Sequence, residues 1–334
     1  FIIQNRLLAA GKPVFWLTSE VVHGGETFAP GAFWVPAGDG VRELLEDAVR
    51  DTGVNAYAAA AKPASPTLPI KPVRIALVDT YGGVMPSGWI RWIFEQFEFP
   101  YEVVYPQGLD AGNLNAKYDV IVFANDVIPS DPRRERGQPD AASIPAEFRG
   151  WLGKITAETT VPQLDRFVRQ GGALIAIGSS TRLAQELGLP VQDALVNAQG
   201  EHLPRTEFFV PGAIMTNVVD VSDPLAYGLP EEVKVYYYNS PAFKVAPGAQ
   251  GVRTVASFPG PDTMISGWAL GQAKLDGASS IVEADLGRGK VFLMGPEVTQ
   301  RAQSHGTYKF LFNGLFYGPA AAAQGDASTV GAGR

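Results

Sequence analysis

The sequence predicts an α/β protein whose larger part is a doubly wound, mostly parallel sheet, preceded by a small α/β segment. Beyond residue 72, short apolar runs alternate with stretches that carry one apolar helical face. Strands that are apolar along their whole length and separated by helices indicate a parallel sheet covered on both sides. Residues 61–69 are rich in proline and small residues, a composition typical of a linker, so we place the domain boundary there.

The composition excludes several classes of function. The 334 residues, 46% hydrophobic and 18% charged, are enough for about two packed domains. The net charge is -7, and the 27 Lys and Arg residues form no basic run, so we expect no nucleic-acid partner. No run approaches the roughly 18 apolar residues of a membrane span, so we expect none. The chain has no cysteine, which excludes disulfides, thiolate metal ligands and cysteine nucleophiles.

Residues 1–62 are predicted to form the small α/β segment. Its elements are a helix that ends at Gly11, strands at 14–17 and 32–35, and an amphipathic helix over 41–51. Because the chain opens inside an apolar helical pattern, we expect another segment to precede it. Residues 63–71 are predicted as the linker.

The main domain is predicted over residues 72–318. Its first expected strands are 74–78, 103–105, 119–124 and 173–177, and its expected helices are 87–97, 161–170 and 181–187. Further strands are expected at 212–221, 234–238, 282–286 and 291–294. Residues 129–155 are polar and contain proline, so we expect a long excursion over the sheet edge. Residues 319–334 are rich in Ala, Gly and Ser and lack periodicity, which predicts a flexible tail.

Five separated stretches carry a resemblance to one family. They are DTYGGVMPSGW at 79–89, EQFEFPY at 95–101, DPLAYGLP at 223–230 followed by NSP at 239–241, SGW at 266–268, and QSHGT at 303–307. In this order they resemble the C-terminal, class I glutamine-amidotransferase-like region of bacterial zinc carboxypeptidase (metallocarboxypeptidase) homologues. The resemblance covers roughly residues 70–318, and residues 1–62 look like the segment between that family's peptidase and amidotransferase-like domains.

The resemblance implies a fold of the flavodoxin or class I glutamine amidotransferase type. It also implies an upstream peptidase domain as partner, with zinc in that domain and no cofactor in this chain. Family members usually enter the secretory path, so a periplasmic or extracellular location is expected. The function implied is that of a non-catalytic accessory domain in proteolysis, which packs against the peptidase domain, shapes its substrate cleft or supports homo-oligomerisation.

The catalytic residues of a class I glutamine amidotransferase are a cysteine on a sharp strand-to-helix turn and a histidine followed by Pro-Glu. The strand at 173–177 runs into such a turn, which places the nucleophile at Gly178 or, with a shift of one residue, at Ser179. The Gly295-Pro296-Glu297 sequence places a glycine where the base should be. Acyl transfer needs a nucleophile and a base that accepts its proton, so we predict no glutamine hydrolysis.

Two alternatives to an accessory role remain open at this point. The first is a serine hydrolase in which His305 serves Ser179, although we favour Ser304 or Thr307 capping the last helix, with His305 hydrogen-bonded locally. The second is a module that binds a small polar ligand, a sugar or a peptide terminus, at the carboxyl ends of the strands. Its candidate residues are Asp79, Tyr81, Ser87, Asn125, Asp126, Ser179, Ser180, Glu297 and His305.

The loop at 81–88 follows a strand and opens a helix, as phosphate-binding loops do, but it lacks their glycine spacing and lysine. We therefore favour a tight turn with Ser87 as the N-cap of the helix. The run Tyr236-Tyr237-Tyr238 is predicted as an alternating strand, and we assign its outward rings to packing rather than recognition.

The sequence His23-Gly24-Gly25-Glu26 spells the His-x-x-Glu pattern of zinc carboxypeptidases. The other histidines, His202 and His305, both lie beyond the linker, so a third ligand would have to come from another domain. We therefore expect His23 in a surface loop and no metal site in this chain.

Overall fold

The computed structural model describes residues 1–129 and 137–331. Its N-terminal part contains α1 (Ile2–Ala9), α2 (Val41–Thr52) and a three-stranded antiparallel sheet of order β4-β1-β5. Those strands are β1 (Val14–Leu17), β4 (Phe33–Trp34) and β5 (Thr67–Ile70), and β2 (Val21–His23) and β3 (Glu26–Phe28) form a separate hairpin. The predicted small α/β segment is present.

Residues 63–71 were predicted as a linker without secondary structure. This prediction is wrong, because β5 lies within these residues. Phe15 of β1 pairs with Pro69 of β5. Pro69 is tolerated because β5 is an edge strand, where a missing N–H breaks no ladder. Leu68 and Ile70 are buried in the same hydrophobic core as the main sheet.

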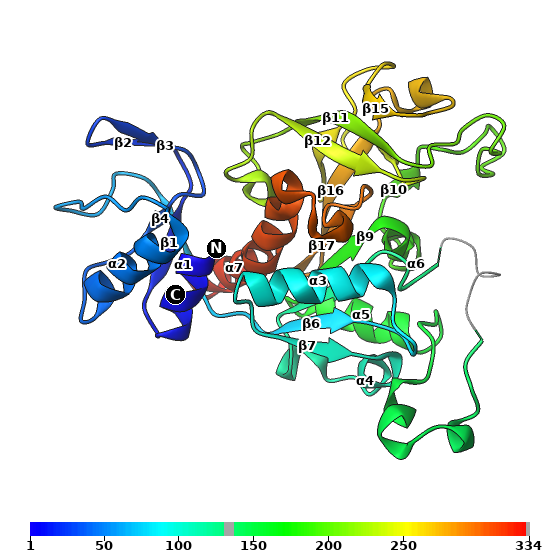
Figure 1. Ribbon diagram of the computed structural model, residues 1–334, viewed down its shortest axis with the longest axis horizontal. Coiled ribbons are helices and arrows are strands. Elements are labelled where there is room, and N and C mark those ends of the chain that lie inside the picture. The colour runs from blue at the N-terminus through cyan, green and yellow to red at the C-terminus, as the bar shows by residue number, and fades with distance from the viewer. Residues whose placement is uncertain (130–136, 332–334) are drawn as a thin grey trace.

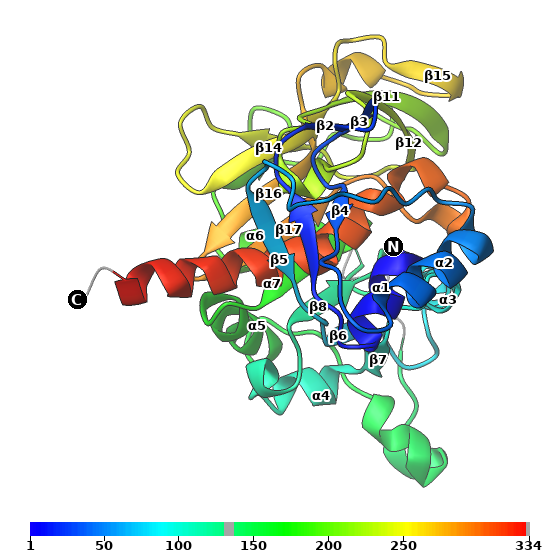
Figure 2. The same cartoon turned by 90° about the vertical axis from the view of Figure 1, so that its left-hand side faces the viewer.

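The small sheet packs against α7 (Tyr308–Gly331), which comes from the other end of the chain (Figure 2). The Trp16 ring lies 6.3 Å from Phe316, and the Phe1 ring lies 5.0 Å from Phe312. One continuous apolar core therefore joins the first and last described segments.

The main sheet contains five parallel strands in the order β7-β6-β8-β9-β17. They are β6 (Ile75–Val78), β7 (Tyr101–Val104), β8 (Val120–Phe123), β9 (Ala173–Ile177) and β17 (Gly289–Met294). Counted along the chain this order is 2-1-3-4-5, which is the flavodoxin order. The predicted fold class is confirmed.

An antiparallel extension continues the sheet beyond β17 in the order β16-β14-β11-β12. These strands are β16 (Ser279–Leu286), β14 (Val252–Ser257), β11 (Ala213–Val219) and β12 (Glu232–Tyr237). Three shorter strands join it, β10 (Val191–Asp193), β13 (Phe243–Val245) and β15 (Met264–Gly267). The tight connection from β16 to β17 leaves no room for a crossover helix, so this pair is antiparallel.

Helices cover both faces of the parallel strands. The end of α3 (Met85–Gln96) lies near α7, because Phe97, the residue after the helix, makes ring contacts with Tyr308 and Phe312. The remaining α-helices are α4 (Pro106–Asp110), α5 (Thr160–Arg169) and α6 (Leu183–Glu186), and Figure 1 shows α3 above β6 and β7 with α4 below them. Among the described residues, no helix is both long and apolar enough to cross a membrane.

Two predicted segments differ in the structure. Residues 319–331, predicted as part of a flexible tail, continue α7 through Pro319, because the alanine run at 320–323 strongly favours a helix; residues 332–334 lie outside the described residues. Of the excursion predicted at 129–155, residues 130–136 also lie outside them, and the remainder contains the 3-10 helices η3 (Ala141–Ser143) and η4 (Ala146–Trp151).

Candidate functional site

The candidate site lies at the edge where parallel strands β8, β9 and β17 end. Asn125 and Asp126 follow β8, Ser179 follows β9, and Glu297 follows β17. Hydrogen bonds link these four residues directly. We call Asn125, Asp126, Ser179 and Glu297 the strand-edge cluster.

The sharp turn after β9 is centred on Gly178. Its φ of +58° lies in the left-handed region, which side chains with a Cβ disfavour. A Cβ placed on Gly178 would lie 2.3 Å from Asn125 Oδ1. The strained residue of the strand-to-helix turn is therefore Gly178 rather than Ser179, and the side chain of Asn125 takes the space that a nucleophile would need.

The position expected for the base is closed by backbone. A Cβ on Gly295 would lie 2.2 Å from the carbonyl oxygen of Pro241 and 3.1 Å from that of Ser280. The Gly295 N–H also donates to Ser280 O at 2.8 Å, which holds this segment in place. A histidine at this position would require the backbone to move.

The Ser179 hydroxyl is engaged with the backbone. It donates to Ile128 O at 2.7 Å and accepts the Asp126 N–H at 3.0 Å, while the Ser179 N–H donates to Asn125 Oδ1 at 2.9 Å. Because this hydroxyl already donates its hydrogen bond to a peptide carbonyl, it is not placed to give its proton to a base.

His305 is exposed, and its ring packs 4.9 Å from Tyr308. The prediction that the Thr307 hydroxyl accepts a free N–H of the last helix is wrong. Thr307 Oγ1 instead donates to Val298 O at 2.6 Å. Ser304 precedes the 3-10 helix η9 (His305–Thr307) and makes no side-chain cap bond.

Several other predicted binding residues serve the fold. Asp79 is buried, accepts the N–H groups of Thr80 and Val84, and pairs with Arg91. Ser180 is fully buried and donates to Ala124 O at 2.7 Å.

The assignment of Ser87 as N-cap is wrong. The N-cap of α3 is Val84, and Ser87 lies inside the first turn because Pro86, with its fixed φ, starts the helix earlier. Ser87 is fully buried, and its Oγ has no hydrogen-bond partner within the described ranges. Tyr81 is half-buried in the preceding loop.

Glu297 is the most electrostatically unusual member of the cluster. Its residue is 7% exposed, and its Oε2 accepts one hydrogen bond, from Asn125 Nδ2 at 3.2 Å. Burial raises the pKa of its carboxyl to about 7, with Asp126 adding to the rise and Asn125 and Arg301 opposing it. This side chain can therefore gain or lose a proton near neutral pH.

One residue that sequence reasoning did not single out, Arg301, acts on this region. Arg301 lowers the pKa of the Glu297 carboxyl, and both Arg301 and Glu297 influence the hydroxyl of Tyr236. Arg301 has a left-handed φ of +48°, which is uncommon for a residue with a side chain. The only sequence signal was the position of Arg301 four residues beyond Glu297.

The three histidines have separate local partners. His23 Nε2 lies 2.8 Å from Ala58 O, and His23 pairs with Glu26 across the β2–β3 hairpin. His202 is mainly exposed and lies 3.2 Å from Asp193. Over residues 1–129 and 137–331, no three His, Asp or Glu side chains are grouped in a way that could hold a metal ion.

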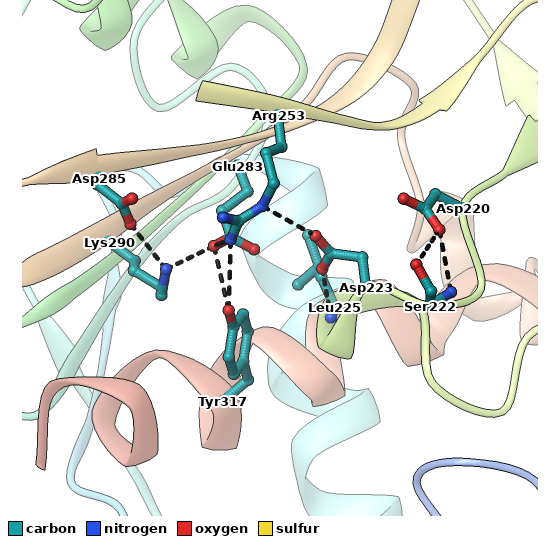
Figure 3. Close-up of polar contacts among 9 residues, drawn as sticks. All are labelled: Asp220, Ser222, Asp223, Leu225, Arg253, Glu283, Asp285, Lys290 and Tyr317. Carbon is teal, nitrogen blue, oxygen red and sulfur yellow. Dashed lines mark hydrogen bonds and ion pairs between the residues drawn. The ribbon is translucent and has the colours of Figure 1, made fainter. Parts of the chain in front are cut away.

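A second buried polar group connects the antiparallel extension to α7 (Figure 3). Glu283 Oε1 accepts from Lys290 Nζ at 2.5 Å, from Tyr317 Oη at 3.2 Å and from Arg253. Lys290 also pairs with Asp285 at 2.7 Å, and Arg253 with Asp223 at 3.4 Å. We call these six residues the Glu283 network.

Two surface depressions lie away from the strand-edge cluster. One, of about 630 Å³, is lined along α5 by residues that include Val161, Asp165 and Arg169. The other, of about 320 Å³, is lined by residues that include Asn197 and Lys274. Neither is lined by the cluster residues.

The strand order defines a doubly wound α/β protein with the flavodoxin strand order. No family model matches the chain, and no curated protein matches it in sequence. Solved structures similar to it include a protein described as ThuA-like from Bacteroides uniformis, at 12% identity over 78% of this chain and 94% of that one, with a TM-score of 0.39.

Two further similar structures come from Thermotoga maritima. A glutamine amidotransferase from this organism is 9% identical over 76% of this chain and 97% of its own, with a TM-score of 0.41. The protein PurLQS from the same organism is 14% identical over 72% of this chain and 97% of its own, with a TM-score of 0.43. These likenesses concern the fold alone.

Proposed function

We propose that this chain is a non-catalytic accessory domain of a zinc carboxypeptidase-like protein involved in proteolysis. The carboxypeptidase context rests on the five ordered sequence motifs, and the non-catalytic role rests on the geometry of the strand ends. In this proposal the zinc belongs to the peptidase domain, and the protein is periplasmic or extracellular.

The observation that carries the non-catalytic role is the closure of both catalytic positions. Asn125 occupies the space beside Gly178, and the Pro241 carbonyl occupies the space beside Gly295. The hydroxyl of Ser179 donates to a backbone carbonyl, so this neighbouring residue does not offer a substitute nucleophile. An architecture kept without its reacting groups fits a structural role better than a chemical one.

Exposed apolar side chains on α3 offer a contact surface for the peptidase domain. Met85 is 65% exposed and Trp92 is 43% exposed on this helix, whereas Ile90 and Phe94 are buried beneath it. Large exposed apolar side chains are typical of surfaces that bind another protein or domain.

The test uses the full-length protein that carries the peptidase domain. We expect Met85→Ser combined with Trp92→Ala to lower peptidase kcat/KM or to change the sedimentation of the assembly, while zinc content stays at one ion per peptidase domain. Trp151→Ala, which removes a tryptophan exposed to a similar extent, is the matched control. Peptidase activity, solubility and oligomeric state all unchanged after deletion of residues 72–318 would overturn the accessory role.

A further inference from the structure

Asp223 lies where η6 (Pro224–Ala226), the antiparallel extension and α7 meet. It is 6% exposed, and its Oδ1 accepts the Leu225 N–H at 2.9 Å, which caps η6. α7 is bonded to the same turn, because Asn313 Nδ2 donates to Leu225 O and to Tyr227 O, each at 3.0 Å. A change at Asp223 therefore acts on the contact between η6 and α7.

One guanidinium joins Asp223 to a second buried carboxyl group. Arg253 Nη2 donates to Glu283 Oε1, and Arg253 Nε lies 3.4 Å from Asp223 Oδ2. Both nitrogens are attached to the same carbon atom, so the two carboxyl groups are neighbours. The other oxygen of Glu283, Oε2, is buried, has no hydrogen-bond partner in the part of the chain that the structure describes, and faces Asp223 in Figure 3.

The Glu283 network contains three carboxyl groups and two cations. Lys290 Nζ donates to Glu283 and to Asp285, and Arg253 donates to Glu283. The side chain of Asp285 is 45% exposed, so water solvates its charge, whereas the side chains of Glu283 and Asp223 are 1% and 4% exposed. Glu283 is bonded to both cations, while Asp223 has the longer contact with Arg253. Asp223 is therefore the buried carboxyl whose negative charge is compensated least.

The electrostatic surroundings of Asp223 agree with this geometry. Burial and the adjacent Glu283 raise the pKa of Asp223 to about 6, while the Leu225 N–H and Arg253 oppose the rise. Because this pKa lies above the ordinary value of 3.8, the contribution of Asp223 to stability is complete below about pH 3.8 and is lost as pH rises through 6. The titratable and charged side chains around it are Tyr227 after η6, Arg253 of β14, Glu283 and Asp285 of β16, Lys290 of β17, and Tyr317 of α7.

We propose that Asp223 is a proton-operated latch between η6, α7 and the antiparallel extension. A proton from solvent removes the charge of Asp223 and gives it an O–H that can donate to Glu283 Oε2. After the proton leaves, two buried carboxylates repel each other beside one guanidinium, and the contact between η6 and α7 opens more often.

The latch reaches the small α/β segment through α7. The rings of Trp16 and Phe1 pack on Phe316 and Phe312 of that helix, so opening of α7 also loosens the first strands and helices of the chain. The latch does not depend on the accessory role, because all of its groups lie in this chain. Failure of either proposal therefore leaves the other standing.

Hydrogen exchange of the backbone amides at 308–320 tests the latch through the opening constant of α7, the ratio of open to closed molecules. The test variant is Asp223→Asn, because asparagine caps a helix as well as aspartate does and has no carboxyl group to ionise. We expect the ratio of opening constants, wild type over Asp223→Asn, to rise about fourfold between pH 5.5 and pH 7.5, if opening returns the pKa of Asp223 from about 6 to 3.8.

The comparison with Asp223→Asn cancels the titration of Glu297, which both proteins share. Asp220→Asn is the matched control, since Asp220 is exposed and bonds to Ser222 outside the network, and its ratio to wild type should not change with pH. A ratio for Asp223→Asn that stays constant between pH 5.5 and pH 7.5 would overturn the proposal.

Carbon NMR titration of the side-chain carboxyl groups keeps the test open if Asp223→Asn does not fold. We expect the Asp223 carboxyl carbon to titrate near pH 6 in the wild type and at a lower pH in Glu283→Gln, which removes the neighbouring charge but keeps an oxygen for Arg253 and Lys290. A midpoint near 3.8 in the wild type, or the same midpoint in both proteins, would contradict the latch.

Discussion

Glu283 lies in β16 and Glu297 follows β17, and both carboxyl groups are buried, but their surroundings differ. Glu283 accepts from Arg253, Lys290 and Tyr317, so cations and a phenol surround its charge. Glu297 accepts from the neutral amide of Asn125, and burial raises its pKa to about 7. The comparison shows two roles for a buried carboxyl group. When cations neutralise its charge, it can link neighbouring strands and helices; when no cation bonds to it, its pKa can rise to near neutral pH.

The largest expected effect comes from breaking the Glu283 network. Glu283→Ala leaves Lys290, whose side chain is 11% exposed, and Arg253 without their shared partner. Removing one member of a buried ion pair costs about 3–5 kcal/mol, and we expect that loss in the free energy of unfolding measured with urea. Glu232→Ala, which removes a surface partner of Lys234, should cost less than about 1 kcal/mol.

A loss below about 1 kcal/mol in Glu283→Ala would contradict the view that this network joins α7 to the sheet. The network also contains Asp223, whose pKa is raised to about 6 by burial and by the nearby Glu283. Stability measurements on Glu283→Ala therefore belong at one fixed pH, so that titration of Asp223 does not confuse the comparison.

The substitution Glu297→Gln tests whether Glu297 makes the free energy of unfolding depend on pH. The folded pKa of about 7 lies above the ordinary value of 4.5, so the carboxyl contributes stability that is complete below about pH 4.5 and lost as pH rises through 7. Glutamine does not ionise, so we expect the variant to gain up to about 3 kcal/mol relative to wild type between pH 4.5 and pH 8.

The measurement is urea unfolding of both proteins at several pH values. Comparing Glu297→Gln with wild type cancels the titration of Asp223, which both proteins share. Glu147→Gln, at an exposed position, is the control and should show no pH-dependent difference from wild type. A constant difference between Glu297→Gln and wild type from pH 4.5 to pH 8 would show that Glu297 is not the titrating group.

A smaller loss of stability is expected when a side chain is added at Gly295, the position expected for the base. Gly295→Ala places a Cβ 2.2 Å from a backbone oxygen, which cannot rotate away, so we expect a loss of about 1–3 kcal/mol. Gly306→Ala is the matched control, because nothing lies within 4 Å of its added Cβ. Equal stability of the two variants in urea unfolding would mean that the loop at Gly295 moves aside easily.

The sequence was sufficient to predict the parallel strands. Runs such as Ala173–Ile177 are buried at every residue, so composition alone marks them. β5 was missed because Pro69 and its small neighbours resemble a linker until pairing with β1 is known. β15 was missed because its residues are mostly exposed on an edge and lack alternation.

The location of the strand-edge cluster was predictable from the sequence, but its packing and its protonation were not. Asn125, Asp126, Ser179 and Glu297 were expected together because they follow parallel strands that end at one edge. The filling of the space beside Gly178 by Asn125 depends on a contact between residues more than fifty positions apart. The raised pKa of Glu297 depends on burial by segments that no local pattern reveals.

The most direct test of the central claim is turnover by the chain itself. Ammonia release from glutamine and hydrolysis of a panel of short-chain esters should both equal the buffer rate, in wild type and in Ser179→Ala alike. Hydrolysis by the wild type that disappears in Ser179→Ala would contradict the account and place a working nucleophile at the end of β9.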